Sequence, residues 1–158
     1  MKGIKMEFKK DKINFCALRN EVGVSAASLA EMLGVRERTV FRWENLGADV
    51  NCLPSASAWK LLYELKDLQN KVYTDALGRI QSIEAEQGHA PDTITLTYYR
   101  SQNDYDTYHV PHDNGDFRIA NASARLCAHA LRVQGYNVVY VEAKENPVYK
   151  HTAKTNKK

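Results

Sequence analysis

The chain has 158 residues, which suits one domain of ordinary size or two small ones. Hydrophobic residues make up 44% and charged residues 26%, a globular composition that excludes wholesale disorder. The formal net charge of +3 is small, so a site for a polyanion would need positive charge concentrated locally. No apolar run approaches the roughly 18 residues of a membrane span, and no apolar stretch follows the first lysines. We therefore expect neither a secretory signal nor a membrane partner.

The first half of the chain is predicted to open with a basic N-terminal arm at residues 1–12, which holds five lysines. Apolar residues at helical spacing then predict three short helices, at residues 13–22, 26–33 and 37–45. Gly23 and Gly34 tolerate the positive φ that ends a helix, and Ser25 is a typical N-cap. Residues 13–54 therefore form the first predicted domain.

A long helix is predicted after Pro54, because apolar residues follow one another in steps of three and four. Gly78 lies inside this segment and is expected to kink the helix, which Gly88 and Pro91 end. The expected apolar stripe consists of Trp59, Leu62, Leu65, Leu68, Val72, Ala76, Ile80 and Ile83.

The pattern changes after Pro91, where β-branched and aromatic residues alternate. We predict, in order, a strand at 93–99, a loop at 101–116, a helix at 117–133 and a strand at 136–142. One face of this helix is expected to carry Ile119, Ala122, Leu126, Ala130 and Leu131. Residues 55–143 form the second predicted domain, and residues 144–158 a lysine-rich disordered tail.

The second and third short helices have the residues that a helix-turn-helix requires. Ala30 is small where two helices would approach closely, and Gly34 supplies the turn. The small core between the helices is expected to consist of Leu29, Leu33, Val35 and Val40. The predicted fold class is thus α+β and mainly α, with an N-terminal helix-turn-helix bundle, a long linking helix and a C-terminal β-loop-α-β dimerisation unit.

Residues 13–47 resemble the lambda-repressor-like (Cro/XRE-type) helix-turn-helix family, most specifically in Arg42-Trp-Glu-Asn and Leu18-Arg19. This resemblance implies that the third helix lies in the major groove of double-stranded DNA. The base-contacting residues implied by position are Glu37, Arg38, Phe41 and Arg42. An arginine can pair with guanine, Glu37 can accept from cytosine N4, and Phe41 can pack on a thymine methyl.

The same resemblance implies a structural pair between Arg19 and Glu44, and a phosphate contact by Asn45. The remaining predicted phosphate-contacting residues are Ser25, Arg36 and Thr39. The chain departs from the family at Ala26, where glutamine is usual, and at Arg36, where a serine or threonine N-cap is common. Losing that cap costs about 1 kcal/mol. We expect the affinity to depend strongly on basic residues and therefore on salt.

The second half is expected to dimerise, because two strands alone make a marginal sheet whose edges invite pairing. Over about residues 13–142 the chain also resembles the YdiL-type helix-turn-helix proteins, which include anti-CRISPR-associated (Aca) autorepressors. The residues that carry this likeness are Leu96-Thr-Tyr-Tyr-Arg and the helix from Asp116 to Leu126. It implies a homodimeric repressor of its own operon, and RNA as a further partner of some members.

Other interpretations remain open from the sequence. Residues 13–47 could be a three-helix core without DNA contacts, or a helix-turn-helix used for protein contacts. The protein could also be an antitoxin or adaptor subunit whose C-terminal half binds another protein. Four tyrosines allow two interpretations: they either pack in the strand and a dimer contact, or stack on RNA bases. These are Tyr98, Tyr99, Tyr105 and Tyr108.

Catalytic and metal-binding patterns are weak in this sequence. His109, His112 and Asp113 match no metal-ligand spacing, and no nucleotide fingerprint or nucleophile motif is present. We therefore expect no enzyme activity, no metal and no cofactor. Three widely spaced cysteines, Cys16, Cys52 and Cys127, indicate free thiols and a cytoplasmic protein. Cys127 is expected in the core.

Overall fold

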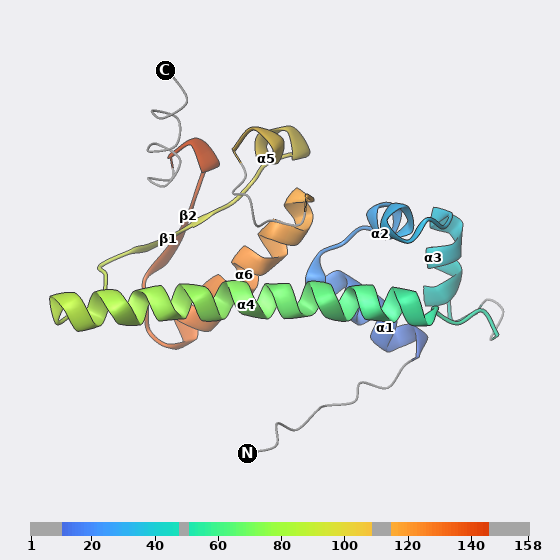
Figure 1. Ribbon diagram of the computed structural model, residues 1–158, viewed down its shortest axis with the longest axis horizontal. Coiled ribbons are helices and arrows are strands. Elements are labelled where there is room, and N and C mark those ends of the chain that lie inside the picture. Colours follow the sequence, from blue (N-terminus) through green and yellow to red (C-terminus); the bar gives the residue numbers. More distant parts are fainter. Residues whose placement is uncertain (1–10, 48–50, 109–114, 146–158) are drawn as a thin grey trace, which may run out of the picture. The chain divides into compact units, whose positions relative to one another are not determined.

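The computed structural model describes residues 11–47, 51–108 and 115–145 (Figure 1). Its helices are α1 (Lys12–Val22), α2 (Ala26–Leu33), α3 (Glu37–Glu44), α4 (Ala56–Gln87), α5 (Gln102–Tyr108), α6 (Phe117–Val133) and the 3-10 turn η1 (Ala143–Glu145). Its strands are β1 (Ile94–Thr97) and β2 (Val138–Val141). The predicted α+β, mainly α class is confirmed. Among the described helices, none combines the length and the apolar character that crossing a bilayer requires.

The chain divides into two compact units, Met1–Leu65 and Lys66–Lys158, so the boundary falls inside α4 rather than at residue 54. The first turns of α4 belong to the first unit because Trp59 and Leu62 are buried there. The Trp59 ring meets the Phe15 ring edge-on, with the ring centroids 5.3 Å apart.

The first unit begins with α1, α2 and α3, and the caps predicted at Gly23, Ser25 and Gly34 are present. The Ser25 hydroxyl accepts a hydrogen bond from the Ser28 amide, and Gly23 and Gly34 adopt positive φ angles of 81° and 65°. The apolar core consists of Phe15, Leu18, Val22, Val24, Ala26, Leu29, Ala30, Val40, Trp43, Ala58, Trp59, Leu62 and Leu65. Leu33 and Val35 are only half-buried, so their predicted place in this core is wrong in part.

The N-terminal arm was predicted one residue too long, because Lys12 is the first residue of α1 and is buried. Asp11 caps this helix by accepting a hydrogen bond from the Asn14 amide at 2.8 Å. Residues 1–10 lie outside the described part of the chain.

In the second unit, α4 continues without a break past Gly78 to Gln87. The expected apolar stripe is wrong at Leu68 and Val72, which are 41% and 44% exposed. Tyr73 and Leu77 face the core instead, next to Ile80. Neighbouring side chains on a helix point about 100° apart. A buried stripe that runs through Tyr73 and Leu77, one position after the expected one, therefore leaves Leu68 and Val72 facing outward.

The two strands are parallel, with Ile94 opposite Val138 and Thr97 opposite Val141, and α6 contacts both (Figure 1). The core between sheet, α6 and α4 consists of Ile80, Cys127, Ala128, Leu131 and Val138. The predicted inner face of α6 is right for Ile119, Ala122 and Leu131, which are buried. It is wrong in part for Leu126 and Ala130, which are only half-buried because α6 turns Cys127 and Ala128 inward.

The expected loop at 101–116 contains helix α5, so that prediction is wrong for residues 102–108. Ser101 begins the helix by accepting a hydrogen bond from the Asp104 amide, and Tyr105 anchors it with only 2% exposure. Tyr105 packs with Tyr99 and Ala143 in a second small core.

The predicted tail also begins too early. Residues 144 and 145 belong to η1, which begins at the buried Ala143, and residues 146–158 lie outside the described part. Beside η1, the Asn121 side chain holds the end of β1. It accepts from the Tyr99 amide at 2.9 Å and donates to the Tyr99 carbonyl at 2.8 Å.

Candidate nucleic-acid interface

Helix α3 is fixed to the first unit by its inner face. Val40 is fully buried and Trp43 is 6% exposed. The Trp43 ring meets the Phe15 ring edge-on, with centroids 5.9 Å apart. Such aromatic contacts contribute about 0.5–1.5 kcal/mol beyond the area that they bury. The inner face therefore sets the position of α3 in its unit.

The predicted pair between Arg19 and Glu44 is present and is largely buried, with the two side chains 13% and 11% exposed. Arg19 donates to both carboxylate oxygens, at 3.0 Å for the Nη2–Oε2 bond, and to the Val24 carbonyl at 2.9 Å. The hydrogen bonds that Arg19 donates to Glu44 raise the pKa of Arg19. This two-point geometry joins the end of α3 to α1 and to the residue before α2.

A second polar anchor, Lys12, was missed from the sequence. Its ammonium group donates to the carbonyl oxygens of Arg42 at 2.9 Å and Asn45 at 3.0 Å. These carbonyls lie at the C-terminal end of α3, where helix carbonyls lack partners and positive charge is favourable. Lys12 stands three residues before Phe15 on the buried face of α1, but its charge alone assigns it to solvent in the sequence.

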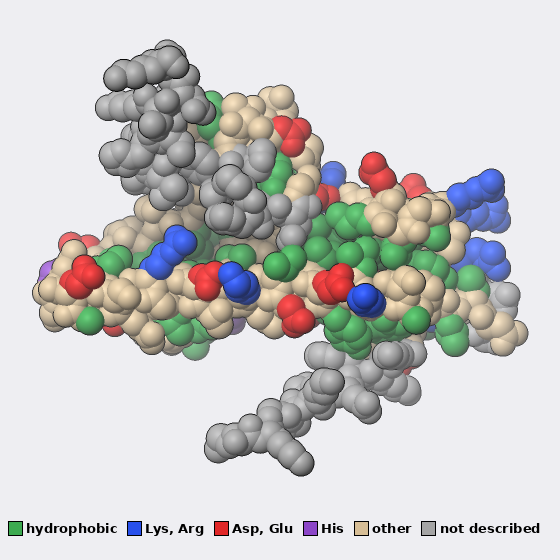
Figure 2. Space-filling view, in the orientation of Figure 1, with side chains coloured by type: hydrophobic (Ala, Val, Ile, Leu, Met, Phe, Trp, Pro, Cys, Tyr) green, Lys and Arg blue, Asp and Glu red, His purple; other side chains and the backbone are tan. Residues whose placement is uncertain are grey.

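The opposite face of α3 is exposed and bears the four predicted base-contacting residues, namely Glu37, Arg38, Phe41 and Arg42. Phe41 is 53% exposed, so about half of this large apolar side chain faces solvent. Basic side chains gather at the outer side of α3 in the space-filling view (Figure 2). With Arg36 just before the helix, three arginines stand against the single exposed acid Glu37 on this surface.

The predicted phosphate-contacting residues are placed less uniformly. Arg36 is exposed and its side chain makes no capping hydrogen bond, so the expected loss of the cap is confirmed. Asn45 is exposed and accepts from the Gly47 amide at 2.9 Å. Thr39 and Ser25 are half-buried, and the Ser25 hydroxyl donates to the Ser28 hydroxyl at 2.9 Å. The Ser25 hydroxyl must therefore turn before it can donate to a phosphate.

One thiol lies beside the polar anchors of α3. Burial, and then the negative charge of Glu44, raise the pKa of the Cys16 thiol above its ordinary value. Cys127 is fully buried in the second unit, as predicted, and burial raises the pKa of its thiol as well. Raised pKa values disfavour the reactive thiolate.

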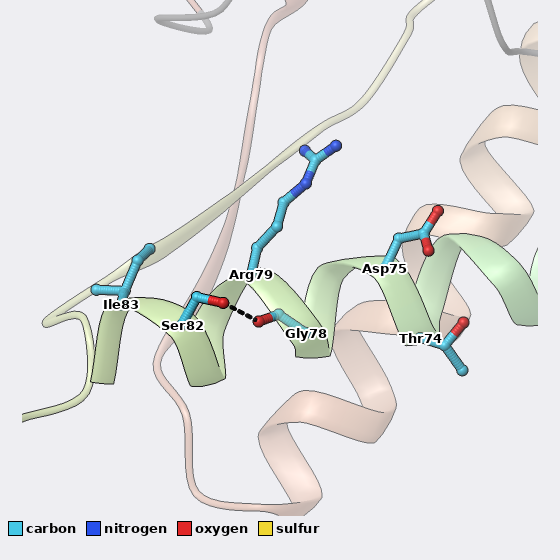
Figure 3. Close-up of a pocket in the computed structure, with 6 residues that line it drawn as sticks. All are labelled: Thr74, Asp75, Gly78, Arg79, Ser82 and Ile83. Carbon is cyan, nitrogen blue, oxygen red and sulfur yellow. Dashed lines mark hydrogen bonds between the residues drawn. The ribbon is translucent and has the colours of Figure 1, made fainter. Parts of the chain in front are cut away.

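Other candidate sites are less convergent. A hollow on α4 is lined by Thr74, Asp75, Gly78, Arg79, Ser82 and Ile83 (Figure 3). All six come from one helix, and the Ser82 hydroxyl is already used by the Gly78 carbonyl at 3.0 Å. Over the described ranges, no three His, Cys, Asp or Glu residues are grouped as metal ligands. His109, His112 and Asp113 lie outside those ranges.

The four tyrosines considered for base stacking separate into two groups. Tyr99 and Tyr105 are 4% and 2% exposed and belong to the core beside α5, while the half-buried Tyr108 packs against it. Only Tyr98 lies on the sheet surface, next to the exposed Tyr140.

Neither a protein-family model nor a curated protein matches this chain. The case for an interface on α3 therefore depends on the residues and geometry of the chain itself.

Proposed function

We propose that this protein is a sequence-specific DNA-binding transcriptional regulator, a homodimeric autorepressor that reads a palindromic operator with α3 as the helix in the major groove. The observation that carries the proposal is the division of α3 into two faces. Val40 and Trp43 fix one face in the core, while Arg38, Phe41 and Arg42 stand exposed on the other. An exposed phenylalanine between arginines suits a surface that meets both thymine methyls and guanine edges.

The preceding turn supports the same assignment. α2 and α3 are joined by Gly34 in a left-handed conformation, followed by the extended Arg36. In Figure 1, α2 and α3 run in clearly different directions, as the two helices of a helix-turn-helix do. Arg36 and Asn45 stand at opposite ends of α3, where contacts with the DNA backbone would fix its position in the groove.

The second unit supports a dimer. Its sheet has two strands, and within the described residues neither outer edge is paired. Val139 and Tyr140 of β2 are 39% and 38% exposed. Two isolated strands are marginally stable, so pairing of a free strand edge with the same edge of a second copy would extend the sheet. Two reading helices would then address half-sites roughly 34 Å apart.

The proposal is tested by selecting bound sequences from random DNA and titrating the winner by fluorescence anisotropy at several salt concentrations. Arg38→Ala should cost about 1–3 kcal/mol of binding and relax selectivity at one base position. Asn45→Ala should weaken all sequences evenly. Lys60→Ala is the matched control, because Lys60 is an exposed cation of the first unit outside α3.

Two results would contradict the proposal. Selection without an enriched sequence would exclude specific reading of DNA, and Arg38→Ala with unchanged selectivity would exclude α3 as the reader. A molecular mass equal to one chain, measured by light scattering, would exclude the proposed homodimer. Copurification of a second protein in fixed ratio would favour the adaptor or antitoxin function instead.

A further inference from the structure

The second unit has a cavity that the proposed DNA reading does not use. It has a volume of about 360 Å³, at the small-molecule end of the range for ligand pockets. Its lining comes from the ends of both strands and from α6, and consists of Tyr98, Arg100, Arg125, Tyr140, Val141 and Glu142. Because these elements converge from distant parts of the sequence, the cavity is a product of the fold.

Two tyrosine rings form the aromatic part of this cavity. Tyr98 follows β1 and Tyr140 lies in β2, with the ring centroids 5.4 Å apart. The Arg132 guanidinium lies over the Tyr140 ring, 5.3 Å from its centroid, and donates to the Val138 carbonyl at 2.8 Å. Tyr140 thus contacts a fixed guanidinium while 38% of its surface stays exposed. An exposed ring of this kind stacks well on a planar heterocycle.

Cations stand next to the rings. Arg125 donates to the Tyr98 hydroxyl at 3.1 Å, and its side chain is otherwise exposed on α6. Arg100 is two residues beyond Tyr98 and lines the same cavity. The Arg100 side chain is 79% exposed. Two guanidinium groups beside one cavity suit a phosphate, which accepts paired hydrogen bonds from arginine.

One carboxylate completes the lining. Glu142 lies 3.7 Å from Arg100 and 2.8 Å from Lys144, measured between charged atoms. Lys144 lowers the pKa of Glu142, so the carboxylate stays ionised and acts as an acceptor. Lys144 and Arg100 both face this carboxylate, and Arg125 is a further cation in the lining. The cavity thus offers an aromatic surface, a phosphate-binding pair and an acceptor for hydroxyl or amino groups.

We propose that this cavity binds a nucleoside monophosphate as a small-molecule ligand, with the base on Tyr140, the phosphate at Arg100 and Arg125, and Glu142 accepting from a sugar hydroxyl or a base amino group. The three parts of a nucleotide match the three kinds of group in the lining, and one nucleotide matches its size. The site is independent of α3, so its occupancy can be measured whether or not the protein reads DNA.

Calorimetric titration of the full-length protein with AMP, GMP, CMP and UMP tests the proposal. Adenosine and inorganic phosphate are the probes that carry only one half of the ligand. At least one mononucleotide should bind at micromolar to millimolar concentration, and more tightly than both half-probes. Arg125→Gln should weaken it about 10-fold or more, since a charge-assisted hydrogen bond is lost. Tyr140→Leu should weaken it about 5-fold or more, through loss of stacking.

Lys71→Gln is the matched control, because it removes an exposed cation of the same unit that pairs with Asp75 outside the cavity. Its affinity should equal that of the unchanged protein. Arg125 is exposed, so its variant keeps the test decisive even if Tyr140→Leu disturbs the sheet. No heat from any mononucleotide, equal binding of inorganic phosphate, or equal loss in Lys71→Gln would each overturn the proposal. Binding of a single-stranded oligonucleotide without any mononucleotide would overturn it too.

Discussion

Replacing Lys12 by methionine tests whether a buried cation holds the C-terminal end of α3. Methionine keeps the apolar stem and removes the ammonium group that donates to the carbonyls of Arg42 and Asn45. Each hydrogen bond from a charged donor contributes about 1.5–3 kcal/mol, from which the desolvation of the ammonium must be subtracted. We expect the two bonds together to contribute about 2–3 kcal/mol. That is a large part of the roughly 3–10 kcal/mol that a unit of this size possesses.

Tryptophan fluorescence during guanidinium unfolding measures this loss in the correct unit, because both tryptophans, Trp43 and Trp59, are buried in the first unit. The unfolding midpoint of Lys12→Met should fall at an unchanged slope, and the thermal midpoint should drop by about 10–20 °C. Lys60→Met is the control, since the Lys60 side chain is 78% exposed and 3.9 Å from Glu64. Its effect should stay below about 0.5 kcal/mol. Equal midpoints for the two variants would refute the role of Lys12.

Three further predictions concern the polar contacts of both units. Arg19→Met should lower the free energy of unfolding by about 2–3 kcal/mol, because it leaves Glu44 largely buried without its cation. The double variant with Glu44→Leu should lose less stability than the sum of the two single variants. Additive losses in fluorescence-monitored unfolding would contradict this coupling. Burial and Glu44 raise the pKa of Cys16, so mass spectrometry should find its alkylation at about pH 8 slower than that of a free thiol and faster in Glu44→Gln. The stability linked to this thiol should be present below its ordinary pKa of 9.0 and lost at higher pH. An alkylation rate unaffected by Glu44→Gln would be inconsistent with that cause. Asn121→Ala should lower the free energy of unfolding by about 2–4 kcal/mol, because the buried Tyr99 amide and carbonyl lose the Asn121 side chain as a partner. Hydrogen exchange in β1 should then be faster. Unchanged exchange would argue against a structural role for these two hydrogen bonds.

The elements that local chemistry determines could be predicted from the sequence. Ser25 and Gly34 mark the ends of α2 because a hydroxyl cap and a residue tolerant of positive φ act within a few positions. The strands follow from β-branched alternation in the same way. Arg19 and Glu44 were paired through a family resemblance rather than through spacing, and their contact is present.

The elements that depend on long-range contacts could not be predicted from the sequence. α5 is a polar helix held by one buried residue, Tyr105, so its sequence lacks the repeating apolar signal of a helix. Lys12 is a cation on a buried face, and a pattern of polar and apolar residues assigns it to solvent. Leu68 and Val72 fit an apolar stripe equally well on paper, and only packing against α6 and the strands selects the neighbouring positions.

The two faces of α3 have a consequence for how such a protein can change. The residues that hold the helix are Val40, Trp43 and Glu44, and Lys12 binds two backbone carbonyls at its end. The side chains at positions 37, 38, 41 and 42 are exposed on the other face of α3. Within the eight residues of α3, the positions that pack in the core are therefore different from the positions that face outward. A library randomised at those four sites should retain the fold, so the exposed surface of α3 can change while the scaffold stays the same.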